Sequence, residues 1–571
     1  MYAHNPNDSQ KGPNDCAVNP RNYWMEAKTR IEEALRIVES VAVRITSMDL
    51  RSSYTTAQRH FYDLHADILL RLRTQKLRKQ PFANYHKVAW GQIERARMTT
   101  LQESVDSLDL LPSQGVAQAD VELLRKLRSE LLFVRNMPDT PEKPNQISKL
   151  TAGLQELEAQ IAQKIPRAAN HADPPVTPDR LSEIQAALTK DTLLLEYALG
   201  ESRSYLWLIT PTTFEVFALP GLARLEGLAR QVRDAMASPK EINTETRAAS
   251  LKMSDWLLGP VASRLGNKRL LIVTDGILDR ISFGALPTPA DSTAVARTDS
   301  GLLIEAHEIV YAPAAMTLLS LSGPRGESQA PASSIVAIAD PVFNARHPQA
   351  AHCKEGRPRA ASAVADTSLA DEELSPVPFG ESERSAFREA VFGPLSSSSR
   401  HELFGFQAKR SNVLTDKLAA FRDVIFYTHG VFNERDQEMT GLALSRLNRE
   451  CDAEKPFLLN LNDIYNLRLS ADLVTLIACD TTRNQTMRGF GLGSIARGFM
   501  YAGATRVMGA LWDVNAQSSL ELATRFYRNR RAGQTAPQAL RNAQLSFLKG
   551  NKSDWRLPYY WAGFVLMGEA N

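Results

Sequence analysis

Short apolar runs closed by a polar or turn-forming residue recur beyond residue 190, and they restrict the fold more than any other feature of the chain. Examples are "RLLIVTDG", "SIVAIADP", "DVIFYTHG", "LVTLIACD" and "RVMGALWD". Their hydrophobicity is continuous rather than alternating, which is typical of strands covered on both faces. Amphipathic stretches such as "SSLELATRFYRNRR" lie between them. The sequence therefore predicts an α/β fold with a mostly parallel sheet flanked by helices.

The first third of the chain has a helical pattern instead. "ALRIVESVAVRI" places Leu35, Val38 and Ile45 on one stripe, and "NYHKVAWGQIERARMTTLQ" does the same with Val88 and Ile93. Two further helical stretches follow, "DVELLRKLRSELLFVRN" and "NQISKLTAGLQELEAQIAQK". These helix pairs keep no clean consensus at the tetratricopeptide period of about 34 residues. We expect an all-α, degenerate tetratricopeptide-like (TPR-like) array ahead of the sheet.

The length of 571 residues and the shifts in composition indicate several domains. We expect a disordered tail over 1–20, a helical regulatory region over 21–165, a first α/β half over 180–322 and a second α/β part over 333–571. The proline-rich "IPRAANHADPPVTP" marks the boundary after the helices. Residues 345–380 show no periodicity and are expected to form a mobile loop. Asp275 ends a strand of the first half with no Cys or His beside it, so this half is interpreted as structural support.

The charge balance gives no reason to expect a nucleic acid or an acidic membrane as partner. The 67 basic and 64 acidic residues leave a net charge of +3. The basic run "RLRTQKLRK" (71–79) lacks interleaved aromatic residues, so it is interpreted as a solvated helix face. No window reaches 18 uninterrupted apolar residues, the length that a transmembrane helix needs. We expect a cytoplasmic protein without a transmembrane segment.

The chain has four cysteines at wide and irregular spacing, Cys16, Cys353, Cys451 and Cys479. This spacing indicates neither a disulfide framework nor a CxxC metal pair, and it favours a reducing compartment. His347, His352 and Cys353 stand close together, but adjacent ligands do not have the usual spacing of a metal site. We interpret them as part of a solvated loop and expect no metal.

Two reactive side chains stand where strands end, His429 after "VIFYT" and Cys479 after "LVTLIA". In open α/β sheets, sites form at the carboxyl ends of strands. The interval of 479 − 429 = 50 residues allows one parallel crossover and is close to the caspase-type spacing of His and Cys. A nearby imidazole can take the thiol proton and hold the thiolate, which is the nucleophile. The backbone N–H groups of Gly430 and Cys479 would stabilise the oxyanion of the tetrahedral intermediate.

Other interpretations of these residues remain open. A buried cysteine is more often a small apolar residue than a nucleophile. The run Gly491 to Ala496 matches the GxGxxA pattern, and Asp513 lies 20 positions beyond Gly493, as in a dinucleotide site. In that fold the glycines follow their strand directly, whereas here a helical stripe surrounds them. We therefore expect no cofactor.

Several segments together resemble the CHAT domain, a caspase-like cysteine peptidase domain that is usually appended to TPR helices. They are "FYTHGVFN", "LIACDTT", "GFGLGSIARGFMYAGATRVMGALWDVN" and the terminal "PYYWAGFVLMG". The resemblance extends upstream to about Trp90. It implies that His429 is the catalytic histidine and Cys479 the nucleophile. Asp480 stands where the family commonly has Glu.

The resemblance also implies substrates and partners. A peptide would bind as an added strand near Trp512, Asp513 and Asn515, with Asp480 nearby. Bacterial relatives are linked to gasdermin-like pore-forming substrates and to RNA-guided effector complexes. The resemblance thus implies a regulated endopeptidase of bacterial immunity or programmed cell death, with a protein substrate and an activating partner at the helices. The alternative is a catalytically inactive, caspase-like interaction scaffold.

Overall fold

The computed structural model of the protein describes most of the chain. Described are residues 20–44, 48–74, 84–103, 117, 119–120, 123, 127, 130–131, 134, 141–164, 178–290, 301–322, 334–354, 374–393, 395–431, 440–454, 456–479 and 492–570. None of the described helices combines the length and the apolar character that a membrane span requires.

Three long helices form a compact unit of their own: α1 (Pro20–Arg44), α2 (Met48–Thr74) and α3 (Tyr85–Glu103). Apolar side chains spaced by about one helical turn pack between them, among them Ile31, Leu35, Tyr62 and Leu72. The guanidinium of Arg71 also lies 4.9 Å from the centre of the Trp24 ring. Further along, α5 (Lys143–Lys164) and α6 (Pro178–Ala187) precede the sheet in sequence.

The first half of the sheet contains five strands. They are β1 (Thr192–Ala198), β2 (Arg203–Ile209), β3 (Phe214–Pro220), β4 (Arg269–Val273) and β5 (Ile309–Tyr311). Its helices are α7 (Leu222–Met236), α8 (Thr244–Leu258), α9 (Ala262–Leu265) and α10 (Thr317–Ser322). Asp275 follows β4 and accepts a hydrogen bond from the backbone N–H of Leu199 at 2.8 Å, so it ties two loops together.

The second half contributes eight strands. They are β6 (Ile335–Ala339), β7 (Arg400–Phe404), β8 (Asp423–Val431), β9 (Gly441–Ala443), β10 (Leu458–Asn460), β11 (Leu473–Cys479), β12 (Arg506–Ala510) and β13 (Phe564–Gly568). Its helices are α11 (Glu381–Val391), α12 (Arg410–Val413), α13 (Leu461–Tyr465), α14 (Leu492–Tyr501), α15 (Ala516–Arg531) and α16 (Ala536–Leu548).

The described strands form one 13-stranded mixed sheet in the order β10-β9-β8-β11-β12-β13-β5-β4-β1-β2-β3, with β6 pairing β7 and β8. The pairs of β11 with β8 and β12, and of β6 with β7 and β8, are parallel, as are β1 with β4 and β4 with β5. β9 pairs with the end of β8 in antiparallel orientation. The pair β13 and β5 joins the two halves through Met567 and Tyr311. The prediction of a mostly parallel sheet with flanking helices and a helical N-terminal region is confirmed.

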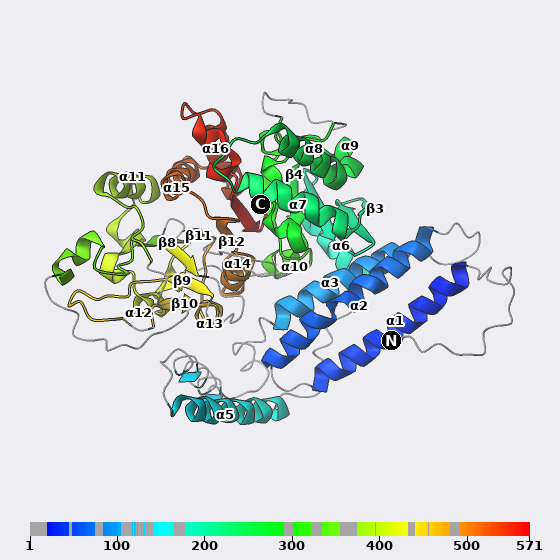
Figure 1. The fold of residues 1–571 in the computed structure, drawn as a ribbon, viewed down its shortest axis with the longest axis horizontal. Coiled ribbons are helices and arrows are strands. Elements are labelled where there is room, and N and C mark those ends of the chain that lie inside the picture. The colour runs from blue at the N-terminus through cyan, green and yellow to red at the C-terminus, as the bar shows by residue number, and fades with distance from the viewer. Residues whose placement is uncertain are drawn as a thin grey trace. The chain divides into compact units, whose positions relative to one another are not determined.

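Helices cover both faces of the strands that carry the predicted reactive residues (Figure 1). On one face, Phe426 of β8 packs against Phe499 of α14, with ring centres 5.4 Å apart. On the other, the hydroxyl of Thr475 in β11 bonds that of Tyr527 in α15 at 2.8 Å. Because side chains alternate along a strand, these contacts on both faces explain why most residues of β8 and β11 are apolar.

Two predictions differ from the structure. The stretch 345–380, expected to be a mobile loop, is packed at both ends: the 3₁₀ helix η7 (Pro348–Lys354) buries Ala350, and Phe379 is buried after residues 355–373, which lie outside the described part. Cys353 and Cys451 form a disulfide, so the expectation of no disulfide is wrong for this pair. The two residues are 98 positions apart, and such a separation carries no sign of contact in space.

Candidate active site

The pairing of β8 with β11 brings the two predicted reactive positions side by side. The strands run parallel and pair residue by residue from Asp423 with Leu473 to His429 with Cys479. Partners in such a ladder lie about 5 Å apart and share one face of the sheet. The structure describes the backbone of Cys479 as the end of β11, while its side chain and residues 480–491 lie outside the described part.

His429 is half-buried at the carboxyl end of β8, and its ring is oriented by two contacts. Nε2 lies 2.8 Å from the carbonyl oxygen of Ser375, and the ring centre lies 5.4 Å from that of Phe343. Because a carbonyl oxygen can only accept a hydrogen bond, Nε2 carries the proton and Nδ1 is the basic nitrogen. Burial lowers the pKa of His429 below its usual 6.5, and the Ser375 hydrogen bond opposes this shift. Burial therefore favours the neutral form of the imidazole.

A short segment, residues 374–379, supplies that carbonyl, and we call it the His429 strap. Its backbone is held on both sides of Ser375. The amide nitrogen Nδ2 of Asn344 donates to the Leu374 carbonyl at 2.8 Å, and the Tyr427 hydroxyl donates to the Pro378 carbonyl at 2.8 Å. Sequence analysis missed the strap, because a backbone carbonyl has no sequence signature.

A buried ionic cluster lies beside the strap at the end of β6. Asp340 accepts a hydrogen bond from Arg384 at 2.6 Å and contacts Nε2 of His347 at 2.9 Å. Its own N–H donates to the carbonyl of Tyr427 at 3.3 Å. His347 is only 2% exposed, so its assignment to a solvated loop is wrong. The Asp directly after the strand in "SIVAIADP" was a signal for this cluster.

Gly430, predicted to donate to the oxyanion, is buried next to His429 and pairs with Leu442 of β9. This pairing begins where β6 ends its contact with β8, so β9 continues the sheet past the histidine. The hydroxyl of Thr428 also donates to the carbonyl of Ala443 in β9. The end of β8 is thereby fixed on the side away from β11.

The residues predicted near the substrate follow β12, which lies between β11 and β13 rather than at an edge of the sheet. Trp512 is 4% exposed, and its indole N–H donates to the Tyr559 carbonyl at 3.3 Å. Asp513 and Asn515 are exposed. Asn515 is the N-cap of α15, because its side chain accepts a hydrogen bond from the Ser518 N–H at 3.0 Å. Asp480 lies outside the described residues.

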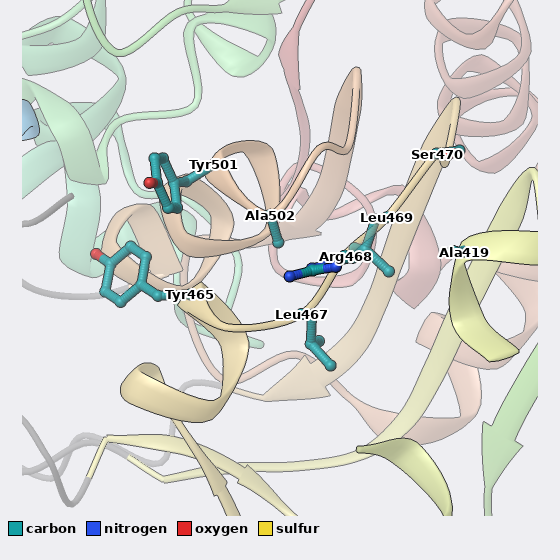
Figure 2. Close-up of a pocket in the computed structure, with 8 residues that line it drawn as sticks. All are labelled: Ala419, Tyr465, Leu467, Arg468, Leu469, Ser470, Tyr501 and Ala502. Carbon is teal, nitrogen blue, oxygen red and sulfur yellow. The ribbon is translucent and has the colours of Figure 1, made fainter. Parts of the chain in front are cut away.

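A described pocket of about 340 Å³ lies at the opposite end of the same strands. Its lining residues precede β8, β11 and β12 in sequence, so they stand at the amino ends of these strands. Figure 2 shows the rings of Tyr465 and Tyr501 beside each other, with Arg468 nearby. The ring centres are 5.8 Å apart. The full lining is Ala419, Tyr465, Leu467, Arg468, Leu469, Ser470, Tyr501 and Ala502. This pocket is separate from the candidate site at His429.

The family model of the CHAT domain matches residues 247–569, which is more than half of the chain. The chain belongs to the CHAT domain family. The resemblance inferred from the motifs is thus confirmed, and the match includes both β8 and β11. His429, Gly430 and Cys479 all lie within this CHAT domain.

Other comparisons cover smaller parts or show weaker likeness. The chain is 33% identical over 119 residues to tetratricopeptide repeat protein 28 of Mus musculus, an alignment that covers 21% of this chain and 5% of that protein. The Saccharomyces cerevisiae separase in its complex with securin is similar over 95% of this chain and 37% of its own, at 9% identity and a TM-score of 0.47. The Arg-specific cysteine proteinase gingipain R is similar over 61% of this chain and 75% of its own, at 10% identity and a TM-score of 0.32.

Proposed function

We propose that this CHAT protein is a cysteine endopeptidase of the caspase-like type, with Cys479 as nucleophile and His429 as general base. The observation that carries the proposal is the register of β8 and β11, in which Cys479 and His429 are Cα partners at the carboxyl ends of two parallel strands. The orientation of His429 by Ser375 adds support, because Nε2 is engaged and Nδ1 is the nitrogen that can accept a proton.

The proposed reaction has two steps. Nδ1 of His429 takes the thiol proton of Cys479, and the sulfur attacks the carbonyl carbon of the scissile peptide bond. The oxyanion forms opposite the backbone N–H groups of Cys479 and Gly430. Collapse breaks the C–N bond, the imidazolium gives its proton to the leaving amine, and a thioester remains on Cys479. Water, deprotonated by His429, then hydrolyses this thioester and regenerates the thiol.

The substrate of the proposed enzyme is a protein segment in extended conformation, bound near the end of β12. Asp513 and Asn515 are exposed there and are proposed to contact the peptide together with Asp480. Trp512 is buried, so its proposed role is to form the floor of that region. An acidic residue at position 513 favours a cationic side chain in the peptide.

The proposed setting is a reducing cytoplasm, with the enzyme held inactive until a partner binds the helical region. Gasdermin-like pore formers as substrates and an RNA-guided effector complex or a protein as activating partner follow from the resemblance of the motifs to CHAT peptidases of bacterial immunity. Stacked helices offer the kind of surface that such partners bind.

A peptide library tests the proposed chemistry without knowledge of the natural substrate. The purified full-length chain is incubated with a proteome-derived peptide library, and new termini are identified by mass spectrometry. We expect cleavage by the wild type and its loss in Cys479→Ala and in His429→Ala, with Cys16→Ser as the matched control that keeps activity. Cleavage by Cys479→Ala at the wild-type rate would exclude the proposed nucleophile.

The inactive scaffold is the second candidate, and thiol reactivity separates it from the enzyme. A thiol paired with a basic imidazole reacts faster with iodoacetamide than an unpaired one. We expect Cys479 to be alkylated at least about tenfold faster than Cys16, and this advantage to vanish in His429→Ala. Equal rates at the two cysteines in the wild type would favour the scaffold.

A further inference from the structure

His352, Cys353 and Cys451 form a cluster of metal-ligand side chains that the proposed peptidase chemistry does not use. Their ligand atoms all lie within 4.8 Å of one another, and among the described His, Cys, Asp and Glu residues this group alone has such spacing. Nε2 of His352 lies 3.7 Å from Sγ of Cys353, whose sulfur is bonded to that of Cys451. One imidazole and two sulfurs therefore converge from segments 98 positions apart.

We propose that reduction of this disulfide converts the cluster into a binding site for a thiophilic divalent cation such as Zn²⁺. Two thiolates and one imidazole are ligands that zinc prefers, and a water molecule completes four-coordination. Sulfurs bound to one zinc ion lie about 3.8 Å apart, given a Zn–S distance of about 2.3 Å and tetrahedral angles. The Cα atoms of Cys353 and Cys451 are 5.6 Å apart, so rotation of the side chains suffices to separate the sulfurs that far.

Reduction of the Cys353–Cys451 disulfide requires a two-electron reductant, and a cellular dithiol can serve as one. The dithiol supplies two electrons and two protons, the S–S bond of Cys353 and Cys451 breaks, and the reductant leaves as a disulfide. Binding of the cation then displaces both thiol protons, while His352 binds as the neutral imidazole. Oxidation reverses the sequence and releases the cation, because a disulfide sulfur is a poor ligand.

The protein around the cluster holds the ligands in place. Cys353 is buried against Val342, Ala350 and Phe406, which fix its place in the fold. Cys451 occupies the left-handed region with φ of 69° and closes a tight turn through its N–H to the carbonyl of Asn448 at 3.1 Å. A residue other than glycine keeps such a backbone only where its surroundings fix it.

Two features of this turn support the imidazole and the second sulfur. Nε2 of His352, which lies 3.7 Å from the Cys353 sulfur, also donates to the carbonyl of Arg449 at 2.9 Å, and this contact holds the imidazole beside the sulfurs. Binding of the cation through Nε2 would replace this hydrogen bond and leave the ring proton on Nδ1. The side-chain oxygen of Asn448 accepts the N–H of Asp452 at 2.8 Å, next to Cys451. The solvated loop expected from the sequence would have neither the buried sulfur nor the ordered turn.

The cluster is connected to the candidate active site by short paths. Val342 belongs to the apolar cluster around Cys353, and the next residue, Phe343, packs its ring on His429. The carbonyl of Val342 accepts the N–H of Arg446 at 2.9 Å, on the segment that leads to Cys451. A cluster that binds a cation, or whose disulfide is formed, would thus hold the residues around His429 in place. This consequence rests on the proposed peptidase function, whereas metal binding itself does not.

Metal content of the reduced full-length protein tests the proposal. The chain is reduced with a phosphine, mixed with Zn²⁺, freed of excess metal and measured by elemental analysis, and Co²⁺ is used as a second probe whose thiolate charge-transfer absorption reports sulfur ligation. We expect one Zn²⁺ per chain with Kd below about 1 μM. After oxidation by diamide we expect the bound zinc to fall below a tenth of this value. A reduced protein that binds no zinc would overturn the proposal.

Single substitutions show which residues bind the ion, and control variants separate a lost ligand from a misfolded protein. Cys353→Ser and Cys451→Ser are expected to abolish the thiolate absorption, and His352→Ala, a change at an exposed residue, to weaken zinc binding at least about tenfold. Cys16→Ser is the matched control with unchanged binding. Cys479→Ala is expected to bind one zinc as well, whether or not the protein proves to be a peptidase. Loss of zinc in Cys479→Ala with retention in Cys353→Ser would place the ion at the candidate active site and refute the inference.

Discussion

At the scale of single residues, the ionisation of His429 sets the pH range in which the proposed enzyme works. Burial lowers the pKa of this imidazole below 6.5, so the basic form persists at more acidic pH than for an exposed histidine. We predict that kcat/KM of a cleaved peptide rises with pH along an acid limb whose midpoint lies below 6.5. The limb belongs to the Cys479 and His429 pair together. A midpoint well above 6.5 would contradict the described environment of the ring.

The role of Asn515 can be resolved by comparing two substitutions. Its side chain caps α15, and loss of an N-cap costs about 1 kcal/mol of stability. We predict that Asn515→Ala lowers the free energy of unfolding by about this amount. Asn515→Ser keeps a capping oxygen and therefore should keep stability. If Asn515 also contacts substrate, as proposed, KM rises in both variants, whereas a purely structural cap leaves KM unchanged in Asn515→Ser. Denaturant unfolding and peptide kinetics measure the two effects.

At the scale of elements, hydrogen bonds hold the His429 strap in position. Removing one of them should lower kcat more than removing a comparable hydrogen bond elsewhere in the protein. Tyr427→Phe deletes the donor to the Pro378 carbonyl, and a bond of this kind contributes about 1 kcal/mol to stability. We predict a several-fold fall in kcat with little change in KM, because the Ser375 carbonyl then orients His429 less well.

Tyr197→Phe is the matched control for that prediction. Tyr197 is buried, and its hydroxyl donates to the Leu257 carbonyl at 3.1 Å in the first half of the sheet. We expect the same loss of stability in thermal unfolding as for Tyr427→Phe, but no loss of kcat. Equal effects of the two variants on kcat would mean that general stability, and not the strap, controls the rate.

The elements also show what sequence could and could not predict. Continuous apolar runs identified β4, β6, β8, β11 and β12, because strands buried on both faces leave that pattern. The strand-end rule placed His429 and Cys479 at one edge, and the pairing of β8 with β11 supports it. The Ser375 carbonyl and the Cys353–Cys451 contact could not be predicted, since the first is backbone and the second depends on how two loops fold over the sheet. The contact of Met567 with Tyr311 likewise joins strands more than 250 positions apart.

At the scale of the whole molecule, the sheet has two chemically different ends. The carboxyl ends of β8 and β11 carry His429 and Cys479, whereas their amino ends meet a partly buried network of charges. Arg530 of α15 bonds Asp472 at 3.0 Å, and Arg506 at the start of β12 bonds the other oxygen of the same carboxylate. Asp423 begins β8 beside this network and is buried. This network links α15 to the amino ends of β11 and β12, while the candidate site lies at the carboxyl ends of β8 and β11.

Stability of the CHAT domain should therefore depend on pH through Asp423. Burial raises the pKa of this carboxyl to about 7, although Arg530 opposes the shift. Between pH 4 and pH 7 the folded state binds a proton that the unfolded state has lost, so the free energy of unfolding falls as pH rises through this range. A shift of about three pH units corresponds to at most about 4 kcal/mol.

Asp423→Asn mimics the protonated carboxyl, and Arg530 keeps its bond to Asp472. We predict that this variant is more stable than the wild type at pH 8 and equal to it at pH 4, by denaturant unfolding at both pH values. Asp234→Asn, at a residue with an exposed side chain, serves as control and should leave the difference between the two pH values unchanged. An Asp423→Asn protein that is less stable than the wild type at pH 8 would show that the carboxylate is ionised and paired in the folded state.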